Sequence, residues 1–237
     1  MTAKIKPIFF VFLFCTGVII VPFIASCGKG ANVAPTTSGI QFQVVNVSPD
    51  LQPIYLYVGL VKQNLTAYSY SYPSGYFSLS RVDPPIQIKS FNPLIAVDPL
   101  ITINAELKRN YKYTLFVSGF RADNSVAGIF VTDTAAPPTA GRGKLRFVNA
   151  SPDSNSFDVF ANGTLAFQKQ RYKSVTSFIQ VPPGNYDFKI IPNGQTSVIS
   201  DFPNVTIADG KVYTLYCRGL AGGADSVKFG TGIINNR

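Results

Sequence analysis

The sequence predicts an all-β protein made of two tandem domains that follow an export signal. Three observations predict this class. Short apolar runs alternate with turn residues, and the chain contains 17 Pro and 19 Gly. No stretch combines the 3.6-residue spacing of apolar residues with the capping residues that a helix requires. A five-residue pattern, Asn46–Asp50, returns 103 residues later as Asn149–Asp153. The N-terminus opens on an apolar segment that ends at a cysteine.

The N-terminal segment is typical of a bacterial lipoprotein signal. A lysine-containing start precedes an almost continuous apolar run over 8–24, which has the charge and length of a signal peptide. The run closes with Ile24-Ala25-Ser26-Cys27, which resembles the lipobox, in which the cysteine receives acyl chains. We therefore expect a signal peptide over 1–26 and a tether over 27–38, lipidated at Cys27. An ordinary signal peptide or a membrane span with a chance cysteine is the alternative.

The residue after the cysteine indicates which membrane the lipoprotein is anchored to. Gly28 stands where an inner-membrane retention signal of many Gram-negative bacteria places Asp, which favours an outer-membrane lipoprotein of a Gram-negative bacterium. No acidic residue follows before Asp50. This favours the periplasm-facing side, with the cell surface as the alternative. Each buried CH₂ contributes about 0.8 kcal/mol, so two or more acyl chains would make the membrane a stable partner.

The repeated pattern sets the domain boundaries. We expect a first domain over 39–133, a linker with two prolines over 134–141, and a second domain over 142–237. In the second domain we expect strands over 144–149, 157–161, 165–167, 177–181, 186–191, 197–199, 204–207, 212–218 and 228–234, with a hairpin turn at Asn162-Gly163. In the first domain a strand is expected over 40–45, and Tyr113–Phe116 matches Tyr213–Tyr216. Turns recur about every 8–12 residues, which is the spacing of a sandwich or a barrel.

Four segments of the second domain carry a family resemblance: Asn149–Asp153, Phe157–Gly163, Val181–Tyr186 and Asp209–Thr214. Together they resemble the domain-of-unknown-function 4397 family, whose domains often occur as tandem pairs in bacterial lipoproteins and secreted proteins. The resemblance implies immunoglobulin-like β-sandwich domains and no established activity. The first domain is similar more weakly, because Val58-Gly59-Leu60 stands where the Asn-Gly hairpin is expected.

The repeated pattern is interpreted as a strand-ending turn. Its proline pre-sets φ for a turn, and its aspartate can accept hydrogen bonds from nearby backbone amides. The residues concerned are Asn46, Ser48, Pro49 and Asp50, and Asn149, Ser151, Pro152 and Asp153. The alternative is a Ca²⁺ site that uses Asp153 and Asp158. Calcium takes about six to eight oxygens, and acidic residues number 12 in 237, so we expect no metal.

A tyrosine-rich stretch is the first choice for a binding surface. Tyr68, Tyr70 and Tyr72 alternate, and Tyr76 follows. A strand would place the three alternating rings on one face. Tyrosines can stack on sugar rings and serve as hot spots for proteins. The alternative is a cross-strand aromatic face that covers the sandwich.

Two short segments resemble an acceptor pattern for O-glycosylation known in one phylum of Gram-negative bacteria. They are Asp133-Thr134-Ala135 and Asp225-Ser226-Val227, with Thr134 and Ser226 as the acceptors. Basic residues are scattered, and the formal net charge is +9. They fit solvation or contact with anionic lipid headgroups. The export signal argues against a nucleic-acid partner.

The composition limits the kinds of catalytic site that the chain can form. The chain has no His, so a Ser/His/Asp triad cannot form, and Cys217 has no partner base and fits a small buried side chain. Glu106, the single glutamate, and the scattered aspartates do not show the spacing of a glycosidase pair. We expect a non-enzymatic cell-envelope lipoprotein that acts as an interaction or spacer module, with no catalytic residues and no cofactor. A glycan-binding or adhesin- or fimbria-associated surface lipoprotein, with a glycan or envelope proteins as partners, and a cryptic hydrolase are the alternatives.

Overall fold

The computed structural model describes residues 39–51, 53–90, 99–153 and 156–237. The chain from Thr37 to Arg237 forms one compact unit. The expected signal peptide, Cys27 and the tether over 27–38 lie outside the described residues. Within the described part, no helix is long and apolar enough to cross a membrane.

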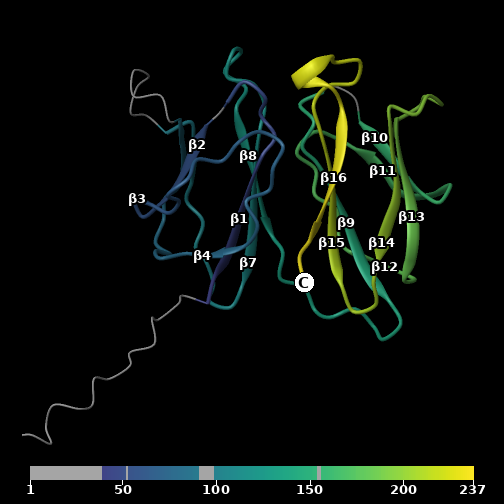
Figure 1. Ribbon diagram of the computed structural model, residues 1–237, viewed down its shortest axis with the longest axis horizontal. Coiled ribbons are helices and arrows are strands. Elements are labelled where there is room, and N and C mark those ends of the chain that lie inside the picture. Colours follow the sequence, from purple (N-terminus) through teal and green to yellow (C-terminus); the bar gives the residue numbers. More distant parts are fainter. Residues whose placement is uncertain (1–38, 52, 91–98, 154–155) are drawn as a thin grey trace, which may run out of the picture. The chain divides into compact units, whose positions relative to one another are not determined.

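The compact unit consists of two repeats, each with eight strands in its described residues (Figure 1). The first repeat contains β1 (Gln41–Asn46), β2 (Ile54–Val58), β3 (Val61–Lys62), β4 (Phe77–Ser78), β5 (Ile86–Ser90), β6 (Ile101–Ile103), β7 (Lys112–Ser118) and β8 (Ala127–Thr132). The second contains β9 (Gly143–Asn149), β10 (Phe157–Ala161), β11 (Thr164–Gln170), β12 (Ile179–Val181), β13 (Gly184–Pro192), β14 (Ser200–Ile207), β15 (Val212–Arg218) and β16 (Gly230–Asn235). A short 3₁₀ helix, η1 (Asp225–Val227), precedes β16.

Each repeat is a sandwich of two four-stranded sheets. The strand orders are β4-β1-β7-β8 and β3-β2-β5-β6 in the first repeat, and β12-β9-β15-β16 and β11-β10-β13-β14 in the second. The two repeats therefore share one topology. In each, the first strand pairs in parallel with the seventh over six residue pairs, β1 with β7 and β9 with β15. The prediction of two tandem sandwich-like domains is confirmed.

The burial of each strand follows from what covers its two faces. In β2, Ile54, Leu56 and Val58 are buried and alternate with half-buried tyrosines, because this outer sheet faces a core on one side only. Strands β1, β7, β9 and β15 are instead buried at nearly every position. Both faces of these inner strands are therefore covered, which requires an apolar layer between the repeats in addition to the core of each.

Each repeat encloses its own hydrophobic core between its two sheets. The first core contains Phe42 and Leu115, and the second contains Phe147 and Phe188, all fully buried. Full burial of a side chain of this kind stabilises a fold by roughly 1.5–3 kcal/mol. Neither core includes residues of the other repeat, so each sandwich has its own source of stability.

The strand predictions for the second repeat agree closely with the structure. Strands β10 and β15 have the predicted bounds, and Asn162 and Gly163 have positive φ of 48° and 78°, as the predicted hairpin requires. The separate strand over 197–199 is wrong, because β14 begins at Ser200 and runs without a break to Ile207. Pro203 lies within β14, which is at a sheet edge, where a proline costs no ladder hydrogen bond.

A glycine ends the seventh strand of each repeat. Gly119 and Gly219 follow β7 and β15 with φ of 84° and 73°. A Cβ at either position would overlap a backbone carbonyl, that of Ser125 or that of Lys228. Both the backbone conformation and the close approach therefore require glycine here.

Candidate functional site

The repeated Asn-x-Ser-Pro-Asp pattern closes a turn at the end of β1. The Asn46 side chain is fully buried. Its Nδ2 donates to the carbonyl of Leu51 at 2.7 Å, and its Oδ1 accepts from the backbone N–H of Ser48 at 3.1 Å. The amide side chain thus satisfies two backbone groups of the turn that follows the strand.

In the second copy the equivalent side chain, that of Asn149, contacts residues that are more distant in sequence. Asn149 Nδ2 donates to the carbonyl of Gln170 at 2.9 Å, and its Oδ1 accepts from the backbone N–H of Ser151 at 3.0 Å and from Cys217 Sγ at 3.1 Å. Asn149 therefore joins the ends of β9, β11 and β15. The sequence analysis placed this residue in a local turn and missed these contacts, although its recurrence at one position of both repeats was the available signal.

The aspartates of the pattern are held by distant amides. Asp50 accepts from the N–H groups of Arg121 and Ala122 at 3.0 and 2.9 Å, although these are 71 and 72 residues away in sequence. Asp153 accepts from Ala221 at 2.9 Å across 68 residues. These partners are distant in sequence, whereas the sequence analysis considered nearby amides, because parallel pairing brings the loop after the seventh strand beside the end of the first.

The aspartates of the calcium alternative already accept hydrogen bonds from protein groups. The described ranges contain no group of three or more His, Cys, Asp or Glu side chains that could hold a metal ion. Asp158, the second aspartate of that alternative, accepts from the backbone N–H of Lys169 at 2.7 Å and from Asn193 Nδ2 at 2.9 Å. The carboxylates of this region are thus used to fix loops and strand ends.

The tyrosine stretch does not form a strand. Between Tyr68 and Pro73 the chain makes two isolated bridges and a turn in which Ser71 has φ of 70°. The predicted shared face is therefore wrong, since a residue with positive φ reverses the alternation of side chains. No Gly or Asn marks this turn in the sequence, so the alternation of tyrosines was misleading.

The four tyrosines have different surroundings. Tyr68 packs against the first core and stacks on Phe77 with ring centroids 6.4 Å apart, and burial raises its pKa. The Tyr70 hydroxyl accepts from Arg218 Nη1 at 3.0 Å. Tyr76 is half-buried, whereas 75% of the Tyr72 surface is exposed. Of the predicted binding residues, Tyr72 alone presents most of its ring to solvent.

A shallow hollow lies beside Tyr72. Its volume is about 360 Å³. Its lining residues are Thr66, Ala67, Tyr68, Ser69, Tyr72, Pro73 and Ser74. It combines two tyrosines and a proline with hydroxyl groups, so its chemistry suits a polar ligand with an apolar face.

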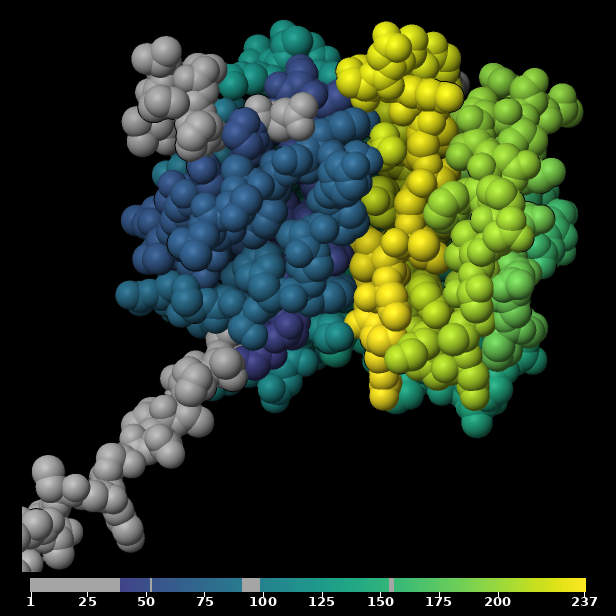
Figure 2. All heavy atoms as spheres, in the orientation of Figure 1, coloured from purple at the N-terminus to yellow at the C-terminus, as the bar shows by residue number. Residues whose placement is uncertain are grey.

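An apolar cluster joins the two repeats. It consists of Val45, Val47, Phe116, Ile129 and Val131 from the first repeat and Val148, Ala150, Tyr216 and Ile234 from the second, all buried. The rings of Phe116 and Tyr216 lie 5.3 Å apart. In Figure 2 the yellow atoms of β16, the strand of Ile234, border the blue atoms of the first repeat. This cluster is the apolar layer that the fully buried inner strands require.

A buried ion pair lies beside this cluster. Arg146 Nη2 on β9 donates to Asp133 Oδ1, just after β8. Asp133 Oδ2 also accepts from Thr114 Oγ1 at 2.6 Å and from the Tyr76 hydroxyl at 2.8 Å. Burial raises the pKa of Asp133, while the Arg146 charge and these hydrogen bonds lower it. Three groups thus compensate a carboxylate that is 3% exposed.

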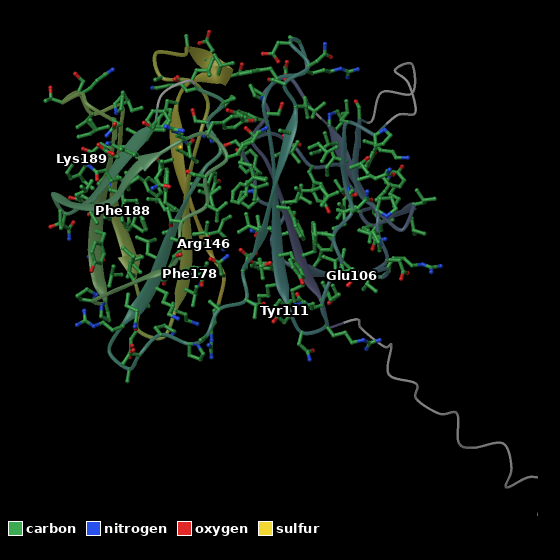
Figure 3. The ribbon with its side chains drawn as sticks, turned by 180° about the vertical axis from the view of Figure 1, so that it is seen from behind. Glu106, Tyr111, Arg146, Phe178, Phe188 and Lys189 are labelled. Atoms are coloured by element: carbon green, nitrogen blue, oxygen red, sulfur yellow. The ribbon has the colours of Figure 1, made fainter. Side chains whose placement is uncertain are left out.

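The arginine is equally well satisfied. Its Nε donates to Thr214 Oγ1 at 2.9 Å and its Nη1 to the carbonyl of Thr132 at 2.8 Å. The guanidinium lies 4.6 Å from the ring centroid of Phe178, beside it in Figure 3. Burial lowers the pKa of Arg146, and the charge of Asp133 opposes this. The sequence analysis did not pair these two residues, because no motif links them.

Cys217 and Glu106 were also considered for chemistry in the sequence analysis. Cys217 is fully buried in the second core, and burial raises its pKa to about 12. Its thiol is therefore neutral and shielded. Glu106 is exposed.

The two predicted glycan acceptors are exposed. Thr134 Oγ1 accepts from the backbone N–H of Lys112 at 2.7 Å, and the Asp133 before it is committed to the ion pair. Ser226 lies in η1. Glycosylation at either residue stays a prediction.

The fold and these contacts define a tandem β-sandwich protein whose polar clusters fix its loops and the joint between its repeats. The family model described as domain of unknown function (DUF4397) matches residues 40–156 and 143–231. The chain belongs to this family. No curated protein matches it. Among solved structures it is similar to the C-terminal domain of AlgF from P. aeruginosa, at 15% identity over 40% of this chain and 98% of that chain, with a TM-score of 0.31.

Proposed function

We propose that this protein is a non-enzymatic cell-envelope lipoprotein, anchored through Cys27 to the outer membrane of a Gram-negative bacterium, and that it acts as an interaction or spacer module. The observation that carries the proposal is the joint between the repeats. Its apolar cluster and its buried ion pair favour two sandwiches that act as one unit at the end of a tether, as a spacer or a display module needs.

The use of polar groups supports a non-enzymatic role. Asp50, Asp133 and Asp153 each accept hydrogen bonds that fix the fold, and Cys217 is buried. A nucleophile or a general base needs a group that is free to meet a substrate. A broad hydrolase screen of the purified protein should show no turnover. Turnover that co-purifies with the folded chain would overturn this part of the proposal and favour the cryptic hydrolase.

The anchor is tested by lipid labelling in cells. With an alkyne fatty acid, the protein should be labelled, and Cys27→Ser should abolish the label. Cys15→Ser, within the signal segment, is the matched control and should keep the label. A globomycin-type inhibitor of the lipoprotein signal peptidase should leave an uncleaved precursor. Normal processing under the inhibitor would refute lipidation at Cys27.

Localisation follows from the same cells. Density separation should place the labelled protein in the outer membrane, and recovery with the inner membrane would contradict the role assigned to Gly28. Protease added to intact cells distinguishes the two faces. Protection indicates the periplasm-facing side, whereas digestion indicates the cell surface.

Glycan binding is the second candidate function, and the hollow beside Tyr72 favours it. The exposed ring and Pro73 offer an apolar face for stacking, and the nearby hydroxyls offer hydrogen bonds. On a glycan array, Tyr72→Ser should weaken binding about tenfold or more, whereas Tyr72→Phe keeps the ring and should retain most of it. Binding that is indifferent to Tyr72→Ser would discard this site. Tyr68 is unsuitable for this test, since its ring supports the first core.

A further inference from the structure

The two repeats meet through the same face of their common fold. The parallel registers place Gln43 beside Thr114 in the first repeat and Arg146 beside Thr214 in the second. Asp133 and Asn236 each follow the last strand of their repeat, and their N–H groups donate to Lys112 and Val212, both at 2.7 Å. The equivalent positions are thus Gln43 and Arg146, Val45 and Val148, Thr114 and Thr214, Phe116 and Tyr216, and Asp133 and Asn236.

The contacts across the joint are reciprocal. Phe116 and Tyr216, at equivalent positions, touch each other. The Tyr70 hydroxyl accepts from Arg218, the last residue of β15. In the opposite direction, the Tyr172 hydroxyl donates at 3.2 Å to Ser118, the last residue of β7.

Tyr70 and Tyr172 are themselves equivalent. The residues that follow them, Ser71 and Lys173, both have positive φ and donate to the carbonyls of Asn46 and Asn149. A surface that contacts its own counterpart in this reciprocal way has the pattern of the isologous interface of a two-fold dimer. The geometry alone would therefore allow each repeat to pair with a copy of itself.

The charges break this symmetry. The counterpart of Asp133 in the second repeat is the neutral Asn236, and the counterpart of Arg146 in the first repeat is the neutral Gln43. The ion pair can thus form once, between unlike repeats. Two first repeats would place each Asp133 against Gln43, and two second repeats would place each Arg146 against Asn236. Both arrangements bury two copies of a charge without the ion-pair partner that it has between unlike repeats, which strongly disfavours them.

We propose that the inner sheets β4-β1-β7-β8 and β12-β9-β15-β16 are complementary pairing surfaces, each of which binds the other repeat and rejects a copy of itself, and that Asp133 and Arg146 set this choice. The apolar cluster supplies attraction that does not distinguish the pairs. The buried Asp133 on one face and the buried Arg146 on the other supply the discrimination. The partner that fits either surface is the complementary repeat.

The test separates the repeats after they have folded. A site for a specific protease is inserted between Pro137 and Pro138 in the chain from Thr37 to Arg237, and the cleaved protein is examined by size exclusion and native mass spectrometry. The two fragments should remain together as a one-to-one complex, with each like pair at least roughly 100-fold less abundant. Folded fragments that separate as monomers, or like pairs at comparable abundance, would overturn the proposal.

The matched variants exchange equivalent residues. Asp133→Asn and Arg146→Gln each install the amino acid that the other repeat carries at that position. The double variant should form unlike and like pairs together after cleavage, whereas Asp133→Asn alone should weaken the unlike pair roughly 100-fold, because Arg146 loses its counter-charge. Lys189→Gln, which removes an exposed ion pair with Asp201 on the outer sheet, should change nothing. A double variant that stays strictly one-to-one would refute the role of the charges.

A measurement on the uncut chain covers the case in which cleaved variants unfold. Each single neutralisation leaves a buried charge alone, and the double variant leaves none. Both single variants should therefore lower the midpoint of thermal unfolding more than the double variant does. A double variant that is at least as unstable as the worse single variant would also count against the proposal.

Discussion

Replacing Asn149 by Ala tests whether the asparagine of the repeated pattern stabilises the fold by joining the ends of three strands. The side chain makes three hydrogen bonds, at 2.9 Å to Gln170, 3.0 Å from Ser151 and 3.1 Å from Cys217. Each ordinary buried group left without its partner costs about 1–3 kcal/mol, and the thiol bond is weaker. The substitution should therefore lower the free energy of unfolding by about 3–5 kcal/mol. Against a typical total of about 5–15 kcal/mol, this is a large share.

Urea unfolding followed by circular dichroism measures this change in the chain from Thr37 to Arg237. Asn46→Ala removes the two hydrogen bonds of the first copy and should cost less, about 2–4 kcal/mol. Asn185, an exposed residue on β13, is the matched control, and its Ala variant should cost less than about 1 kcal/mol. If Asn149→Ala lowered the free energy of unfolding no more than the control does, the hydrogen bonds of Asn149 would not stabilise the fold and the reasoning would be refuted.

Three further outcomes are expected. Because burial raises the pKa of Cys217 to about 12, a thiol reagent at pH 8 should modify it only as fast as the fold opens. The unfolded thiol ionises near pH 9.0, so the free energy of unfolding should also fall as pH rises from there to about 12. Rapid labelling of the folded chain would contradict the burial of the thiol on which both expectations rest. Gly219→Ala should cost about 3 kcal/mol or more, because its Cβ meets a carbonyl, against about 1 kcal/mol for Gly163→Ala, which has positive φ but open space. Millimolar Ca²⁺ or a chelator should leave the midpoint of thermal unfolding unchanged, since amides already occupy Asp50 and Asp153, and a clear rise with Ca²⁺ would restore the calcium site.

The sequence predicts local structure well where side-chain alternation and turn chemistry agree. Strand β10 ends at Asn162-Gly163, whose backbone has the positive φ of the predicted hairpin, and the twofold occurrence of Asn-x-Ser-Pro-Asp establishes the duplication. The tyrosine stretch shows the limit of this reasoning. Its alternation resembles a strand, but a turn at Ser71 sends Tyr68 toward the core and leaves Tyr72 in solvent.

Long-range partners could not be predicted, because they depend on which strands become neighbours. The sequence around Asp133 does not indicate that Arg146 is its partner. The sequence around Asp50 likewise does not indicate that it accepts from the amides of the hairpin after β7. One signal of the joint was nevertheless available. Val45 and Val148 occupy the strand face opposite to each core, at equivalent positions. An apolar residue on the outward face of both copies indicates that something covers that face.

The parallel pairing of β1 with β7 has a mechanical consequence. The chain ahead of residue 39 leads directly into β1, which lies inside its sheet between β4 and β7. Tension drawn along β1 therefore loads its six-pair ladder with β7 in shear, and the hydrogen bonds share the force instead of opening one after another. Forced unfolding is governed by the rate of unfolding, so this first strand determines how long the fold survives a pull on its N-terminal side.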